Sequence, residues 1–287
     1  MDALGPIAVV AGGGRLPAQV IRAAELSGRE VITIAIKGEA DASLSAFDPV
    51  VLGWGQIGKL FDTIHQAGAK EVVLIGSVTR RPDFTSIVGD LGTMRRLPRI
   101  LSALVGGDDS LLVRVMGIFE REGLRVIGAH ELAPELLASG GVMAGPYPDD
   151  QDNLAVKLGL EAVRMLGALD IGQAAIAVGT RVVAVEGAEG TDAMLVRCRD
   201  LRENGRVRAK GRVGVLVKCA KPDQDLRVDL PTVGPDTVRR AQAAQLKGIA
   251  VEAGRVLISD REETLAVCNE LGIFLLGIEA RAKEPTP

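Results

Sequence analysis

The sequence predicts a two-domain α/β protein, in which a doubly wound N-terminal domain precedes a distinct C-terminal α+β domain. Its 287 residues exceed the usual size of one domain, about 100–200 residues. Short apolar runs alternate with helical patterns in the first half, whereas paired apolar runs flank glycine-containing turns in the second. We expect domains over residues 1–139 and 140–278, followed by a flexible tail over residues 279–287.

The predicted N-terminal domain begins with a strand, Ile7–Ala11, and a helix that starts near Pro17, a favoured first-turn residue. Strands that alternate with helices imply parallel βαβ units with right-handed crossovers and helices on both faces of the sheet. The other elements expected here are strands at Glu30–Ile36, Glu71–Gly76 and Arg125–Gly128, and helices at Gln56–Ala67, Met94–Val105 and Ser110–Glu122.

The second half follows a segment rich in glycine, proline and aspartate, Gly140–Asp152, which we interpret as the interdomain connection. Gly179-Thr180 and Ala253-Gly254 each separate two strand-like runs, so each predicts a hairpin. The elements expected are hairpins Ala174–Val178 with Arg181–Glu186 and Ile249–Glu252 with Arg255–Ser259, strands Val213–Lys218 and Ile273–Leu276, and helices Asn153–Leu166, Pro235–Gln245 and Asp260–Leu271.

Composition excludes several classes of protein. Hydrophobic residues make up 47% of the chain and charged residues 25%, which is ordinary for a globular protein. Aromatic residues make up only 2%, so the core must be aliphatic. The net charge of −3 argues against a nucleic-acid partner, because proteins that bind nucleic acids normally carry a basic face.

The cysteines and the apolar runs predict the cellular compartment of the protein. Cys198, Cys219 and Cys268 are too few and too scattered for a disulfide framework or a zinc site, so we expect reduced core thiols. No signal peptide is visible, and no run approaches the roughly 18–20 apolar residues that span a bilayer. We expect a cytoplasmic protein that meets any lipid from the water side. Peripheral contact with the cytoplasmic face of the inner membrane and homo-oligomerisation both stay open.

A glycine loop, Gly12–Arg15, leaves the first strand and opens the first helix. Glycines let a ligand approach the backbone, and a helix N-terminus offers N–H groups and positive potential to an anion. The loop departs from the dinucleotide fingerprint, because Pro17 replaces the third glycine and Lys37 precedes the nearest acid, Glu39. We expect an anion site; an NAD site and a tight structural turn are the alternatives.

A second loop, Gly76–Pro82, follows a buried strand. In open α/β sheets ligands bind at the carboxyl ends of the strands. Ser77, Arg80 and Arg81 are therefore candidates for contact with phosphate or uracil, with a solvated basic loop as the alternative. Asp108 or Asp109, just before a predicted helix, is most simply an N-cap.

Acidic residues are densest in the second half. Asp223, Asp225, Arg227 and Asp229 are each two residues apart, and in an extended segment this spacing puts their side chains on one face. Carboxylates with water and phosphate oxygens suit Mg²⁺, and a nearby lysine or arginine would neutralise charge on phosphorus. A solvated turn is the alternative. A second acidic group, Glu186 with Glu189–Asp192, follows another strand.

The remaining chemistry-bearing residues form no legible arrangement. His65 and His130 have no motif partner, so we expect structural roles for them. No Ser/His/Asp or Cys/His set is visible. Two rival function classes stay open: an NAD-dependent oxidoreductase, which Pro17 disfavours, and a non-catalytic nucleotide-sugar sensor.

Taken together, these motifs resemble the LpxI-type UDP-2,3-diacylglucosamine pyrophosphatases over residues 5–278. The most specific stretches are Glu189-Gly190-Thr191-Asp192 and Gln224–Pro231, far more so than the glycine loop. The resemblance also rests on Gly13–Pro17, Gly76–Val78, Gly107–Leu112, Asp150–Asp152, Asp170–Gln173, Val185–Ala188 and Lys218–Asp223.

The resemblance implies an Mg²⁺-dependent enzyme of lipid A biosynthesis in Gram-negative bacteria. It would hydrolyse the pyrophosphate bond of a lipid-linked UDP-sugar, UDP-2,3-diacylglucosamine, to 2,3-diacylglucosamine 1-phosphate (lipid X) and UMP. It also implies a Rossmann-like N-terminal domain, a distinct C-terminal catalytic domain and a lipid-sugar bound between them. The essential aspartate of the family falls on Asp225.

These expectations combine into one site hypothesis. Asp225 binds Mg²⁺ together with Asp223 or Asp229, and Lys218, Lys221 and Arg227 neutralise charge on the phosphates. The catalytic candidates are thus Asp225, Lys218 and Arg227. The substrate-binding candidates are Gly13, Gly14, Arg15, Ser77, Asp109, Gln151, Thr191 and Lys221.

Overall fold

The computed structural model describes residues 5–79, 93, 108–222 and 224–279, and the chain forms two compact units. Unit 1 comprises residues 1–135 together with the short segment Asp225–Asp229, and unit 2 comprises the remainder. The fold class predicted from sequence is confirmed, since unit 1 holds a parallel sheet and unit 2 a separate mixed sheet. The predicted helix Met94–Val105 and the tail beyond Glu279 lie outside the described residues.

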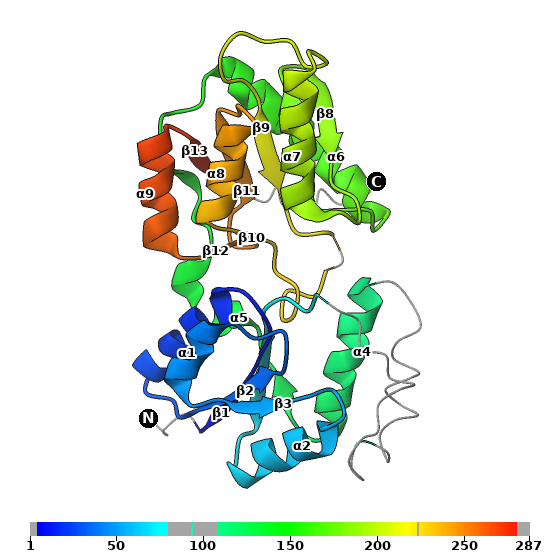
Figure 1. Cartoon of the computed structure of the whole chain (residues 1–287), viewed down its shortest axis with the longest axis vertical. Coiled ribbons are helices and arrows are strands. Elements are labelled where there is room, and N and C mark those ends of the chain that lie inside the picture. Colours follow the sequence, from blue (N-terminus) through cyan, green and yellow to red (C-terminus); the bar gives the residue numbers. More distant parts are fainter. Residues whose placement is uncertain (1–4, 80–92, 94–107, 223, 280–287) are drawn as a thin grey trace, which may run out of the picture. The chain divides into compact units, whose positions relative to one another are not determined.

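Unit 1 is built on a five-stranded parallel sheet in the order β3-β2-β1-β4-β5. Figure 1 shows α1 and α5 on one side of this sheet and α2 and α4 on the other. The strands are β1 (Ile7–Ala11), β2 (Val31–Ile36), β3 (Val50–Leu52), β4 (Glu71–Ile75) and β5 (Arg125–Val126). The helices are α1 (Leu16–Leu26), α2 (Ile57–Gln66), α4 (Asp108–Arg121) and α5 (Ala129–Leu132).

Both faces of the sheet in unit 1 are covered, which explains why its strands read as continuous apolar runs. On one face, Ala8 and Val10 of β1 pack with Phe61 of α2 and with Met116 and Phe119 of α4. The intervening residues of β1 are also fully buried. The strand order reverses direction at β1, so the gap between β1 and β4 is the topological switch point, where open α/β sheets bind ligands.

Unit 2 is built on a six-stranded mixed sheet in the order β6-β13-β11-β9-β7-β8. Its three central strands, β13, β11 and β9, are parallel, and the outer strands run antiparallel to them or to each other. These strands are β6 (Gly141–Ala144), β7 (Ala174–Val178), β8 (Arg181–Val185), β9 (Val215–Lys218), β11 (Gly248–Glu252) and β13 (Phe274–Ile278). A two-stranded parallel sheet adds β10 (Thr232–Val233) and β12 (Leu257–Ile258).

Helices cover both faces of the six-stranded sheet. α6 (Asp150–Ala168) packs through Val156 and Val163 on one face, and α7 (Gly190–Glu203), α8 (Pro235–Ala243) and α9 (Arg261–Leu271) build the larger core on the other. α7 was not expected from the sequence. The three cysteines are buried and unpaired, as expected. No helix in the described part of the chain is long and apolar enough to cross a bilayer.

Two local predictions for the second half were wrong. The hairpin expected around Ala253-Gly254 does not form, because β11 lies in the six-stranded sheet whereas β12 pairs with β10. The amide of Gly254 donates to the Ala138 carbonyl, so the turn is closed by another part of the chain. Segment Gly140–Asp152, expected to be a connection, instead contributes β6 and the first turn of α6.

Candidate functional site

Two loops meet at the switch point of unit 1. The amide of Gly12 donates to the Ile75 carbonyl over 2.8 Å, and Gly13 and Ser77 exchange two backbone hydrogen bonds of 2.8 Å. Gly76, with φ +98°, allows this approach, because a Cβ there would lie 2.7 Å from the Gly13 carbonyl oxygen. The glycines therefore join the β1–α1 loop to the end of β4, where a phosphate would be expected to bind.

The amides of the glycine loop are used within the protein. Gly13 donates to Ser77, and Gly14 donates to the carboxylate Oδ2 of Asp41 over 2.6 Å. The next group in this loop that could bind an anion is the N-terminus of α1, where Arg15 is the N-cap residue. The amides of Gly13 and Gly14 are thus already bonded within unit 1, and the anion site expected at this loop stays a prediction.

Acids from the loop after β2 complete this edge of the sheet. Glu39 Oε2 accepts hydrogen bonds from the amide and hydroxyl of Thr79, at 2.8 and 2.9 Å. With Asp41 on Gly14, two carboxylates tie the three loops after β1, β2 and β4 together. These acids were not singled out as site residues, although their position after the second strand of a βαβ unit is where a ribose-binding acid is expected.

The predicted metal and catalytic segment belongs to unit 1, although it lies about 90 residues beyond that unit's last helix in the sequence. The segment Asp225–Asp229 is a turn: the Asp225 carbonyl accepts the amides of Val228 and Asp229 over 3.2 Å. The prediction that this segment is extended, with its side chains on one face, is therefore wrong. An aspartate favours a turn when its side chain accepts a hydrogen bond from the amide two residues later. Asp225 does this, because its Oδ1 accepts from the Arg227 amide over 3.0 Å.

Arg227 is held between two carboxylates. Its Nε and Nη2 donate to Asp225 over 3.0 and 2.7 Å, and its Nη1 donates to Glu120 of α4 over 3.2 Å. Val228, the next residue, packs on the core shared by α2 and α4. The turn is thus anchored to unit 1 by one apolar and one ionic contact.

The charges of this pair are stable at neutral pH. The hydrogen bonds from the Arg227 side chain, more than any other factor, lower the pKa of Asp225 below its ordinary value. The same bonds raise the pKa of Arg227. Asp225 is therefore an anion and a weak base, which suits a ligand for a cation better than a group that removes a proton.

His130 lies beside this turn. A Cβ built on Gly128, two residues after β5, would lie 2.5 Å from Nδ1 of His130 and 3.3 Å from the Cα of Arg227. Nδ1 is buried and makes no hydrogen bond to the described residues. Gly128 is thus the point where the imidazole and the Asp225–Asp229 turn meet, at the carboxyl edge of the parallel sheet. His130 had been expected to be structural, and no motif in the sequence links it to Arg227.

The other candidates lie in unit 2, where several already have partners. Lys218, at the end of β9, is buried and donates to the Thr232 carbonyl over 3.0 Å. Thr191 is buried and donates to Glu186 over 2.9 Å. Lys221 pairs with Asp170, and Gln151 is exposed in the first turn of α6.

Three predicted residues cannot be placed in the site. Asp223 and the arginines of the Ser77 loop, Arg80 and Arg81, lie outside the described residues. Asp109 is the second residue of α4, which begins at Asp108 directly after residues that the structure does not describe, so the prediction that Asp108 or Asp109 is an N-cap stays a prediction.

The acceptor capacity of the Asp225 carboxylate is compatible with a bound magnesium ion. A carboxylate offers about four acceptor positions, and three N–H groups of Arg227 occupy Asp225. Mg²⁺ typically takes one or two protein carboxylates and completes its shell with water and substrate phosphate oxygens. By this count Asp225 keeps about one acceptor position that a cation could use. Within the described residues, no group of three or more His, Cys, Asp or Glu side chains is arranged to hold a metal.

Comparison with known proteins identifies relatives over the whole described chain. The LpxI N-terminal domain family matches residues 6–136, and the LpxI C-terminal domain family matches residues 139–276. A curated relative from Caulobacter vibrioides, UDP-2,3-diacylglucosamine pyrophosphatase LpxI, is 40% identical over 277 residues. That alignment covers 96% of this chain and 99% of the relative.

Proposed function

Because this chain belongs to the LpxI family of UDP-2,3-diacylglucosamine pyrophosphatases, we propose that it hydrolyses the pyrophosphate bond of UDP-2,3-diacylglucosamine to lipid X and UMP. The full-length similarity to the Caulobacter relative is the observation that carries this proposal. The reaction would serve lipid A biosynthesis. In it, a water oxygen forms a bond to phosphorus while the bridging P–O bond breaks, and the proton of the water is released.

The charge of the substrate sets the chemical problem. A pyrophosphate diester carries two negative charges, which repel an attacking water. Enzymes that transfer phosphoryl groups act mainly by positioning and by neutralising charge. Arg227 can supply positive charge, since its raised pKa keeps the guanidinium protonated and its side chain is partly exposed. We propose that Arg227 faces the phosphates during turnover.

Asp225 is proposed to hold Mg²⁺, with Asp229 or Asp223 as a further ligand. Its lowered pKa keeps it ionised, as a metal ligand must be. When bound, the ion would polarise the phosphoryl oxygens and make a bound water more acidic. The Arg227 bonds to Asp225 orient the carboxylate, which supports a preorganised ligand rather than a mobile one.

Residues of both units are proposed to bind the substrate. In unit 1, the N-terminus of α1 at Arg15, with Gly13, Gly14 and Ser77 shaping the loop around it, is the proposed anion site. In unit 2, Lys218 and Lys221 are proposed to neutralise further charge, and Thr191 and Gln151 to contact the substrate. Asp109 of α4 completes the proposed set.

One assay tests the proposal. Purified protein is incubated with UDP-2,3-diacylglucosamine with Mg²⁺ or with a chelator, and lipid X and UMP are separated by thin-layer chromatography. We expect both products only with Mg²⁺. Products formed equally with the chelator would reject the metal, and no products with added Mg²⁺ would reject the activity in favour of a non-catalytic sensor. Quenching of NADH fluorescence by the protein would support the oxidoreductase alternative.

A further inference from the structure

A basic loop joins α7 to β9 in unit 2. It carries Arg206, Arg208, Lys210 and Arg212 at every second position, and Arg202 precedes it on the last turn of α7. No Asp or Glu lies between Asn204 and Gly214. The whole chain has a net charge of −3, whereas the charge of this loop is positive.

Within the described residues, none of these five cations forms an ion pair. Their hydrogen bonds go to backbone carbonyls: Arg208 to Gly205, Arg202 to Gly211 and Arg212 to Leu271. Other cations of the same unit, such as Arg197, Arg239 and Lys247, pair with carboxylates. The side chains of Arg206, Arg208, Lys210 and Arg212 are exposed. Their charge is thus not neutralised by a carboxylate of the residues that the structure describes.

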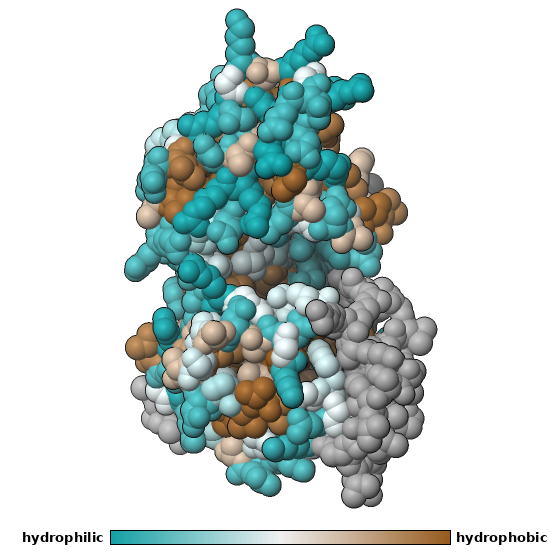
Figure 2. Space-filling view, viewed as in Figure 1, coloured by the Kyte–Doolittle hydropathy of each residue, from teal (hydrophilic) through white to brown (hydrophobic). Residues whose placement is uncertain are grey.

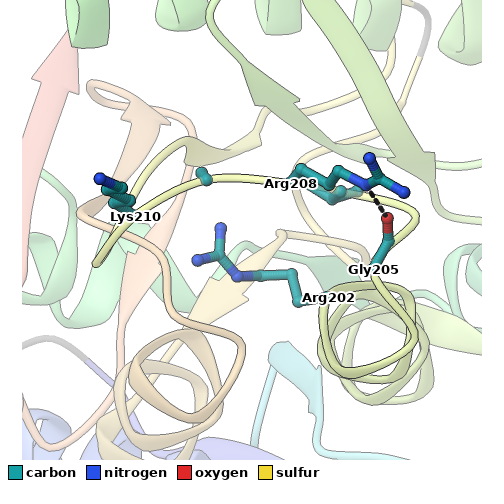
Figure 3. Close-up of a pocket in the computed structure, with 6 residues that line it drawn as sticks. Arg202, Gly205, Arg208 and Lys210 are labelled. Atoms are coloured by element: carbon teal, nitrogen blue, oxygen red, sulfur yellow. Dashed lines mark hydrogen bonds between the residues drawn. The ribbon is translucent and has the colours of Figure 1, made fainter.

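The loop encloses a shallow hollow of about 500 Å³, lined by Arg202, Gly205, Val207, Arg208, Ala209 and Lys210. Figure 3 shows the guanidinium group of Arg202 directed toward the part of the loop between Arg208 and Lys210. Nη1 of Arg202 is buried and makes no hydrogen bond to a described residue. Three of the residues that line the hollow, Arg202, Arg208 and Lys210, are cations, so the hollow is positively charged.

We propose that this loop binds the phosphate groups of an anionic lipid bilayer, and so brings the enzyme to the membrane that holds its lipid substrate. The inference rests on the proposed function, since the substrate carries two acyl chains and lies in a bilayer. Clusters of four or more exposed lysines and arginines are the signature of binding to anionic lipids. The loop contains no aromatic residue on which nucleic-acid bases could stack, which favours a lipid surface over single-stranded nucleic acid. Hydrophilic residues cover the end of unit 2 that carries the loop (Figure 2).

The test is sedimentation of the full-length protein with vesicles of phosphatidylcholine, with or without phosphatidylglycerol. We expect binding only to vesicles that contain phosphatidylglycerol, and its loss as salt rises from about 0.1 to 0.5 M, because salt screens surface charges. The triple variant Arg206→Gln, Arg208→Gln, Lys210→Gln should bind about a hundredfold more weakly, at roughly fivefold for each charge removed. A matched control neutralises three exposed cations elsewhere in unit 2, Lys157→Gln, Arg164→Gln and Arg181→Gln, and should bind like the wild type.

Turnover separates this inference from the proposed function. With substrate dispersed in detergent, the triple variant should match the wild type, whereas with substrate in anionic vesicles its turnover should fall. Equal vesicle binding by the triple variant and the wild type would overturn the inference, as would equal loss in the control variant. Binding of inorganic phosphate or a single-stranded oligonucleotide by this loop, without vesicle binding, would also overturn it. If no variant, nor the wild type, turns over detergent-dispersed substrate, the proposed function fails instead.

Discussion

Replacing Asp225 with alanine is expected to abolish turnover while leaving the fold of unit 1 largely intact. Alanine removes the proposed Mg²⁺ ligand without adding bulk. The loss in kcat is expected to reach about 10³-fold, which corresponds to roughly 4 kcal/mol of transition-state stabilisation. Substrate binding should change much less, because Asp225 acts on the phosphates through the metal.

The cost to stability follows from the contacts that disappear. Arg227 loses one of its two carboxylate acceptors, but it keeps Glu120, the carbonyl of residue 225 still accepts two amides, and Val228 still packs on the core. Arg227 is 39% exposed and Asp225 26% exposed, so solvent screens much of their attraction. We expect a loss of about 1–2 kcal/mol of unfolding free energy, or roughly 3–8 °C in Tm.

The assay follows UMP release by thin-layer chromatography at saturating Mg²⁺, with thermal unfolding measured on the same preparation. Asp236→Ala is the control, because Asp236 also pairs with an arginine, Arg239 over 3.0 Å, but on an exposed surface of unit 2. That variant should turn over like the wild type. A folded Asp225→Ala protein with near wild-type turnover would refute the assignment of the metal site. A variant that unfolds would instead make Asp225 structural, and the metal would then be sought around Glu189 and Asp192.

Three further outcomes are expected. Asp225→Asn should cost stability near pH 7. Because the pKa of Asp225 is lowered in the folded protein, this difference should begin to shrink as pH falls below about 3.9, the pKa of an unfolded aspartate, and should be gone only below the lowered pKa; urea unfolding near pH 7 and through this acid range checks it. Gly76→Ala should destabilise the protein far more than Gly68→Ala: both have positive φ, but only the Cβ at Gly76 would meet the Gly13 carbonyl, and equal Tm losses would contradict this. The Cys219 thiol, whose pKa burial raises to about 12, should resist iodoacetamide at pH 8 until urea unfolds the chain; rapid labelling of native protein, read by mass spectrometry, would show that the site is open.

Local sequence pattern was enough to locate most helices and strands. The run Ile7–Ala11 is a strand with those bounds, because five consecutive apolar residues are buried on both faces of a parallel sheet. The hairpin around Gly179-Thr180 also forms, with β7 antiparallel to β8. The same signal at Ala253-Gly254 failed, because turn residues encode a change in chain direction but not the partner of the strand that follows.

The arrangement of the candidate site depended much more on tertiary contacts. The spacing of the acidic residues could not show that the Asp225 segment is a turn. The one signal for a turn in the sequence was Asp225 itself, because aspartate side chains often accept the amide two residues later. Nor could the sequence show that the glycine amides are already bonded to Ser77 and Asp41, since those partners come from other strands of the sheet.

By itself, the sequence determined the α/β fold class with its two units and the family to which the chain belongs. Only the tertiary structure decided that the Asp225 turn is part of unit 1. Arg227 meets Glu120 across 107 residues of sequence, and Val228 joins a core built by the first half of the chain. Such a contact depends on which surfaces pack together, because hydrophobic burial and charge pairing act through space, whereas periodicity and motif spacing report only the neighbours along the chain.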